Sequence, residues 1–145
     1  MRIRQILFMA LSAMCLSGVC GTAYAQDDDD DGHIYTVSTY KWPFNNLEEI
    51  FGLMEETQDI VEKNEYILSR KVLTHYWAGE FSVMTIIEYA SLADIEKAQE
   101  RSTELFNAKY PEEAEREARN ENFSALTGTA MHVDSILQEN PALTK

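Results

Sequence analysis

The stretch Phe81-Ser-Val-Met-Thr-Ile-Ile-Glu-Tyr-Ala90 contains a single acidic residue and is rich in β-branched and aromatic side chains. It is too short for a helix that stands alone, and its apolar residues leave no continuous polar face. This composition is typical of a strand that is buried on both sides in the middle of a sheet. We therefore expect the rest of the chain to be arranged around this strand.

Three further strands are expected because apolar and polar residues alternate. One runs from Tyr66 to Ala78, immediately before the central strand, and Gly79-Glu80 lies between the two as a tight turn. This arrangement predicts an antiparallel hairpin. The same alternation predicts strands from Ile34 to Trp42, where Pro43 ends the run, and from Met131 to Gln138.

Apolar residues recur at helical spacing in the two segments that connect these strands. The first helix is expected from Leu47 to Lys63, because its apolar residues fall on one stripe. The second begins after Ser91-Leu-Ala-Asp94, which has the spacing of a capping box. Pro111 indicates a further helical segment, which Gly128 ends.

The predicted order is strand, helix, strand, strand, helix, strand. This order is that of an α+β, ferredoxin-like β-α-β-β-α-β sandwich, in which strands one and three are central and both helices cover one face of a four-stranded antiparallel sheet. The other face would present apolar side chains such as Met84 and Ile86 without cover. Because exposed patches of this kind mark partner surfaces, we expect a homodimer whose sheets pack face to face.

The first 25 residues have the pattern of a secretory signal peptide: two early arginines, an apolar run from Ile6 to Val19, and the small residues of Ala23-Tyr24-Ala25. We expect cleavage before Gln26 and export to a bacterial periplasm or to the medium. Cys20 leaves lipidation open as an alternative, although the preceding valine is branched where a small residue is usual. Both cysteines lie in this segment, so the mature chain would have no thiol for catalysis, disulfides or zinc.

The mature chain is strongly acidic. Two of the 12 basic residues and none of the 25 acidic ones precede the cleavage site, so cleavage changes the formal net charge from −13 to −15. A net negative charge of this size argues against binding to nucleic acids, and against binding to membranes after cleavage. Residues 26–32 open like a calcium loop, but the twelfth position is Ser38 rather than Glu, so an acidic, disordered leader is expected before a single domain at 33–145.

His75 is the strongest candidate for a catalytic side chain, because it shares a strand face with Leu73 and Trp77 beside the hairpin. A neutral imidazole there could relay a proton or bind a substrate. The alternative is a histidine at the surface or dimer interface that pairs with a carboxylate. The candidate ligand-binding aromatic residues suit a flat apolar ligand and equally the core of a dimer; they are Tyr40, Trp42, Tyr76, Trp77 and Tyr89.

No metal and no cofactor are expected. The three histidines lie in different predicted elements, without the spacing of metal ligands. His132 and Asp134 share a strand face, but two ligands make only a fragment of a site. The sequence also contains no glycine-rich phosphate loop and no nucleophile elbow.

The segment from Thr74 to Tyr89, followed by Ala90-Ser-Leu-Ala-Asp-Ile-Glu-Lys-Ala98, resembles the dimeric α/β-barrel superfamily. That superfamily includes small monooxygenase-like, stress-responsive and NIPSNAP-like domains. A strand, a small residue, Ser-Leu-x-Asp and a helix commonly follow one another there. The resemblance implies the fold over about Ile34 to Gln138, a dimer, and often a cavity between sheet and helices. It implies no catalytic set.

These observations favour an exported dimeric α/β-barrel protein that has no catalytic machinery of its own and binds a small apolar ligand in the cavity between sheet and helices. Two alternatives remain. One is a cofactor-free, monooxygenase-like enzyme that uses His75. The other is a structural periplasmic protein whose charged helix from Glu112 to Glu121 contacts a basic partner.

Overall fold

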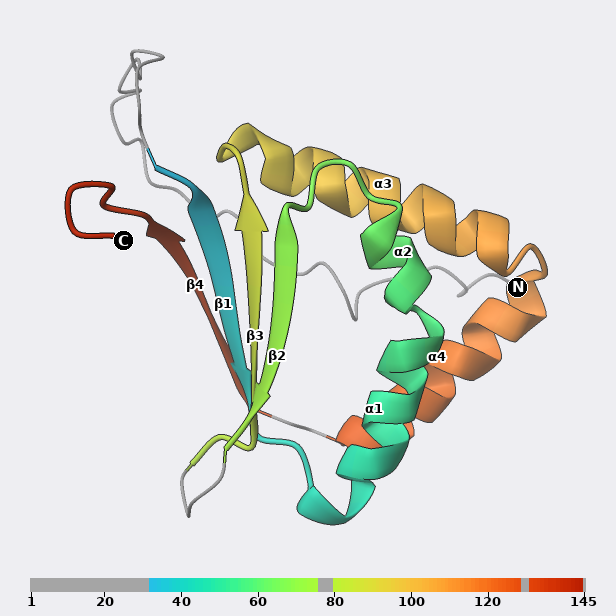
Figure 1. Ribbon diagram of the computed structural model, residues 1–145. Coiled ribbons are helices and arrows are strands. Elements are labelled where there is room, and N and C mark those ends of the chain that lie inside the picture. The colour runs from blue at the N-terminus through green and yellow to red at the C-terminus, as the bar shows by residue number, and fades with distance from the viewer. Residues whose placement is uncertain (1–31, 76–79, 129–130, 145) are drawn as a thin grey trace, which may run out of the picture.

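The structure is a computed structural model that describes residues 32–75, 80–128 and 131–144. The predicted signal segment, Tyr76, Trp77 and the predicted turn glycine lie outside these ranges. The expected order of strands and helices is confirmed (Figure 1). The elements are β1 (Ile34–Tyr40), the short 3-10 helix η1 (Phe44–Asn46), α1 (Leu47–Glu56), α2 (Gln58–Glu62), β2 (Ser69–Thr74), β3 (Val83–Tyr89), α3 (Ala93–Lys109), α4 (Glu113–Thr127) and β4 (His132–Gln138).

The four strands form one antiparallel sheet in the order β2-β3-β1-β4. In its register, Ile34 of β1 lies opposite Tyr89 of β3, and Tyr40 of β1 lies between Val83 of β3 and His132 of β4. The helices all lie on one side of the sheet (Figure 1). The ferredoxin-like α+β fold predicted from the sequence is therefore confirmed, with β1 and β3 in the centre.

The core lies between the helices and the central strands as two separate clusters. Ile34, Tyr89 and Ala98 form the cluster under α3. The other cluster joins Trp42 and Val83 to Ile50 of α1, which is 0% exposed. The helix-facing side of β3 is buried throughout most of its length, as its apolar composition predicts.

Several local details differ from the sequence-based prediction: β1 ends at Tyr40 rather than Trp42, β2 begins at Ser69 rather than Tyr66, and the helices also differ. The first helical connection is not continuous, because Thr57 leaves helical geometry and its hydroxyl bonds to the carbonyl of Met54 at 3.1 Å. Hydroxyls that bond back to the preceding turn bend helices. The capping box forms only in part: the Asp94 carboxylate interacts with the backbone of Ser91, but the Ser91 hydroxyl bonds to that carboxylate at 2.8 Å and not to a backbone N–H.

The predicted end of the last helix is confirmed, although its start is not. Helix α4 begins at Glu113 rather than at Pro111, because Glu112 has an extended backbone. It ends before Gly128, whose φ of 63° is available to glycine at little cost. No residue of α4 is fully buried, in agreement with its nearly continuous charge.

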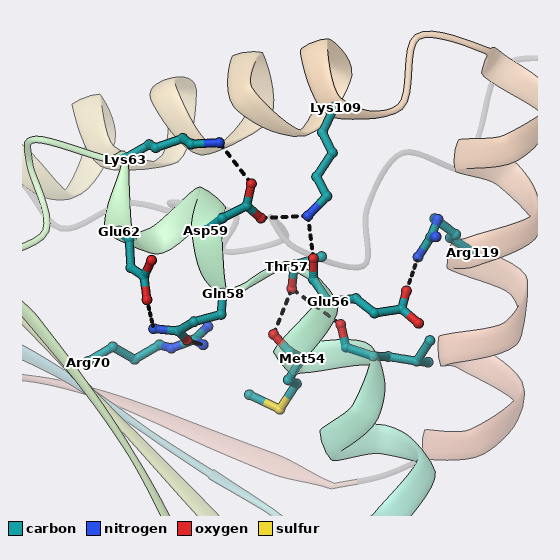
Figure 2. A network of polar contacts seen from close by, with 11 residues as sticks. Met54, Glu56, Thr57, Gln58, Asp59, Glu62, Lys63, Arg70, Lys109 and Arg119 are labelled. Carbon is teal, nitrogen blue, oxygen red and sulfur yellow. Dashed lines mark hydrogen bonds and ion pairs between the residues drawn. The ribbon is translucent and has the colours of Figure 1, made fainter.

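Ion pairs tie the helices to one another (Figure 2). Asp59 of α2 accepts hydrogen bonds from Lys63 at 2.9 Å and from Lys109 of α3 at 2.5 Å. Glu56 of α1 pairs with Arg119 of α4 at 2.6 Å. The hydrogen bonds from Lys109 and then Lys63 lower the pKa of Asp59 to about 2.

Strand β4 is exposed along its whole length. Its side chains alternate in direction: Ile136 points to the side of the helices and is 53% exposed, and Leu137 points to the opposite side and is 52% exposed. The helices therefore do not cover β4 on their own side of the sheet, and its other side is exposed as well. Over the ranges that the structure describes, no helix has the length and apolar character to cross a membrane.

Candidate functional site

A groove of about 360 Å³ lies between the helix-facing side of β2 and the α1–α2 segment. Sites for small molecules have volumes of roughly 300 to 1,000 Å³ and mainly apolar walls. A second hollow, on the outer surface of α3, has only polar and acidic lining and lacks such walls. The first groove is therefore the candidate ligand site; its lining consists of Phe51, Met54, Glu55, Gln58, Arg70, Val72 and Thr74.

The two walls of the groove follow from strand and helix periodicity. Along β2, every second residue points toward the helices, and the register places Val72 opposite the buried Thr85 of β3. The helical residues at 51, 54, 55 and 58 follow the spacing of one helix face, which continues across the break at Thr57. The groove thus forms where two amphipathic elements meet at an edge of the sheet.

Among the described residues that line the groove, Arg70 is the only cation. Its guanidinium is half-buried and donates a hydrogen bond to the side-chain oxygen of Gln58. The Gln58 amide donates in turn to Glu62 at 3.3 Å (Figure 2). Burial lowers the pKa of Arg70, and the nearby Glu62 opposes this effect. Within the described ranges no carboxylate lies within ion-pair distance of Arg70, so a neutral amide holds this charge.

The aromatic residues predicted to bind a ligand do not gather at one place. Tyr40 and Trp42 stack with their ring centroids 4.5 Å apart, and Trp42 meets Phe123 of α4 edge-on at 5.9 Å. Trp42 and Tyr89 are each 6% exposed, but they belong to different core clusters. The other two predicted aromatic residues lie outside the described ranges. Trp42 and Tyr89 therefore pack in the core, and a ligand-binding role for this set stays a prediction.

His75 follows β2 directly. Its N–H donates to the carbonyl of Ser82 at 2.9 Å, and its side chain is exposed. Strand alternation places it on the face of Leu73, which is opposite to the face of Arg70 and the groove. The face of the sheet that the helices do not cover is called the open face below. A catalytic role for His75 stays a prediction, and its side chain would then contact a substrate on the open face.

Sequence reasoning missed a polar cluster around Glu88 on the open face. The Glu88 carboxylate accepts from the Ser69 hydroxyl at 2.5 Å and contacts Nδ1 of His33 at 2.5 Å and the Tyr35 hydroxyl at 3.3 Å. The Ser69 bond, and then the His33 bond, hold the pKa of Glu88 below its usual value. Tyr35, Ser69 and Glu88 of this cluster belong to three different strands, and His33 directly precedes β1, so only the strand register could reveal the cluster.

His132 and Asp134 lie together on β4, with Nε2 of the histidine 3.3 Å from the carboxylate. Both side chains are exposed, and the imidazole also stacks on Tyr40 with centroids 5.9 Å apart. In the part of the chain that is described, no three potential ligands gather in a way that could hold a metal ion. The pair on β4 is thus an exposed edge-strand contact.

No protein-family model matches this sequence, and no curated protein is significantly similar to it. Solved structures share its fold. A dimeric ferredoxin-like protein from an uncultured marine organism has a TM-score of 0.54 at 13% identity, covering 79% of this chain and 94% of its own. A provisionally assigned antibiotic biosynthesis monooxygenase from Caulobacter crescentus has a TM-score of 0.52 at 14% identity, covering 76% and 92%.

The cofactor-independent oxygenase SnoaB from Streptomyces nogalater has a TM-score of 0.52 at 9% identity, covering 80% of this chain and 100% of its own. At identities this low, the similarities concern the fold alone. They confirm that the chain has the ferredoxin-like architecture of the superfamily that its sequence resembles.

Proposed function

We propose that this chain is a small-molecule-binding protein whose ligand lies in the groove between β2 and the α1–α2 segment. The observation that carries the proposal is the lining, in which three apolar side chains, Phe51, Met54 and Val72, occur together with one cation, Arg70, and with three other polar residues. Apolar walls with a few polar groups that fix orientation are the usual composition of sites for small molecules. The groove thus offers an apolar surface for the body of a ligand and a charged side chain that can fix its orientation.

The proposal includes a homodimer that covers the open face of the sheet. Leu73, Val133 and Leu137 are between 48% and 52% exposed on this face, beside half-buried Val37 and Ile86. The helices all lie on the other side (Figure 1). Two such faces stacked on one another would bury these side chains in an interface with a dyad axis. The ferredoxin-like protein from the marine organism is described as dimeric.

The proposal also places the mature protein outside the cytoplasm. The support is the charged start, apolar run and small residues of the first 25 positions, which lie outside the described ranges. The intact mass of the exported protein tests this part. A chain that begins at Gln26 is the expected result. A chain that begins at Cys20 with an attached lipid would contradict cleavage before Gln26, and an uncleaved chain would contradict export.

Native mass spectrometry of the exported protein tests binding and assembly together. We expect a dimer that carries extra mass, which denaturation releases. Val72→Trp fills the groove and should remove the extra mass, whereas Ile136→Trp, at an exposed position on β4, should keep it. A wild-type monomer would contradict the open-face interface. Retention of the extra mass by Val72→Trp would contradict the groove as the site.

The second candidate function is a cofactor-free oxygenase. The fold-level similarity to SnoaB, which is described as a cofactor-independent oxygenase, favours this candidate. His75 would then be the residue that handles the proton. Oxygen uptake with phenolic aromatic substrates tests it: uptake by the wild type that His75→Ala abolishes, with folding intact, would support the enzyme. Absence of uptake by the wild type would leave the binding function.

A further inference from the structure

We infer that the groove binds a monoanion, namely an elongated or flat apolar molecule whose single carboxylate, sulfonate or phenolate oxygen group pairs with Arg70. This inference rests on the proposed function, because it names the class of molecule that the same groove takes.

Arg70 has unused hydrogen-bonding capacity. A guanidinium carries five N–H donors in a planar fork that matches an oxyanion in a bidentate manner. Within the described ranges, Arg70 makes one side-chain hydrogen bond, to the neutral oxygen of Gln58. By contrast, Lys109 and Arg119 in the helix layer each contact a carboxylate. Arg70 is not among the residues with buried unsatisfied side-chain nitrogens, so its other N–H groups remain accessible to an anionic ligand.

The surroundings hold the guanidinium in place without neutralising it. Gln58 accepts the Arg70 hydrogen bond and donates to Glu62, so an amide links the two charges where a direct ion pair would otherwise be expected. Figure 2 shows the side chains of Gln58, Glu62 and Arg70 together beside α2, whose first and last residues are Gln58 and Glu62. The fork is therefore oriented before a ligand arrives, which lowers the entropy lost on binding.

The other charges limit the ligand to one negative charge. Glu55 is the only acidic residue among the described residues of the lining, and Glu62 lies close enough to influence Arg70. Together with Arg70, these two carboxylates give a local net charge of −1, so a phosphate dianion would be repelled more strongly than a monoanion, and a monoanion must be held by direct contact with the guanidinium fork.

The length of the groove sets the size of the apolar part. From Arg70 to Thr74 the strand advances by four residues, which is about 13 Å at roughly 3.3 Å per residue. Val72 lies midway, and Phe51 and Met54 line the helical wall. An anion at Arg70 would thus have an apolar body extending toward Thr74, with a length suited to a two-ring aromatic acid.

Two fluorescent probes separate the charge from the apolar body. Anilinonaphthalene sulfonate and N-phenylnaphthylamine share an aromatic framework and differ in the sulfonate. At one ionic strength, we expect the wild-type protein to bind the sulfonate ~10- to 100-fold more tightly, the factor that a charge-assisted hydrogen bond provides. Arg70→Met should reduce this preference to about unity.

Lys71→Met is the matched control. It removes the same charge from the next residue, whose exposed side chain lies on the open face, so it should preserve the preference. Loss of the preference in Lys71→Met as much as in Arg70→Met would show a general charge effect and overturn the inference.

Val72→Trp distinguishes a failure of the groove as the binding site from a failure of the monoanion inference alone. If it leaves the affinity for both probes unchanged, or if neither probe binds the wild type, the groove is not the site and the proposed function fails with the inference. If it abolishes binding of both probes while Arg70→Met retains the sulfonate preference, the binding function stands and the monoanion inference is overturned. Far-ultraviolet circular dichroism of each variant verifies that it is folded.

Discussion

Replacement of Ser82 by Ala is expected to destabilise the protein by more than the loss of one oxygen atom suggests. Ser82 is 2% exposed and directly precedes β3. Its hydroxyl oxygen accepts from the Trp42 N–H at 2.8 Å and lies 3.0 Å from the Trp42 carbonyl and 3.2 Å from the Tyr40 carbonyl, to which it can donate. The hydroxyl therefore fixes the path of the chain where it leaves β1 for the helices.

The magnitude follows from the donor that the mutation leaves without a partner. The Trp42 N–H bonds to the Ser82 hydroxyl and is buried with it. An unsatisfied buried N–H costs about 1 to 3 kcal/mol, and the hydrogen bond lost to the carbonyl adds about 0.5 to 1.5 kcal/mol. We therefore expect the free energy of unfolding to fall by about 1.5 to 4.5 kcal/mol, which corresponds to a decrease in Tm on the order of 10 °C for a domain of this size.

Urea unfolding followed by tryptophan fluorescence measures this change. The protein concentration must be equal for all variants, because the apparent stability of a dimer depends on it. Ser91→Ala is the control: its hydroxyl bonds to a carboxylate at the exposed start of α3, and its removal should change stability by less than about 0.5 kcal/mol. Equal effects of the two mutations would refute the reasoning from the buried N–H.

Three further changes test the core, the helix layer and the interface. Ile50→Ala should cost about 2 to 5 kcal/mol and Ile50→Val about 0.5 to 1.5 kcal/mol in the same urea assay, because Ile50 is 0% exposed; equal costs would contradict its close packing. Hydrogen bonds from Lys109 and a second lysine lower the pKa of Asp59 to about 2 in the folded protein. The ionised carboxylate therefore stabilises the fold fully above the unfolded pKa of about 4, and this stabilisation is lost as the pH falls through about 2. Asp59→Asn should therefore flatten the unfolding midpoint against pH in that window, and an unchanged slope would be inconsistent with the ion pair. Leu137→Asp on the open face should yield a monomer in sedimentation velocity, whereas Ile136→Asp, equally exposed on the other face, should remain dimeric; identical behaviour would argue against an open-face interface.

Local periodicity was sufficient to predict the sheet. Alternation in four segments, with helical spacing between them, led to the correct strand order and to helices on one face. The apolar stretch that begins at Phe81 is indeed central, because β3 pairs with both β1 and β2. These features depend on the chemistry of neighbouring residues, which a sequence displays directly.

The groove could not be predicted in the same way, because it depends on which edge of the sheet the helices cover. Arg70 appears in the sequence as one polar residue of an alternating strand. Its amide partner Gln58, and the residue Phe51 that lines the same groove, lie on a helical segment that Thr57 interrupts. Composition also indicated many aromatic residues without showing that Trp42 and Tyr89 would enter separate clusters.

The pairing of β1 with β4 has a consequence for biosynthesis. Ile34 lies opposite Gln138, so the first described strand acquires one of its two neighbours only when the last strand has been made. Until then, a partly synthesised chain that has joined β1 to β3 presents the other edge of β1, with free N–H and C=O groups, to any extended peptide nearby. Premature termination before His132 would make this edge permanent and favour aggregation. The time at which β4 pairs with β1 thus decides whether the sheet is completed within one chain or β1 pairs with another nascent chain.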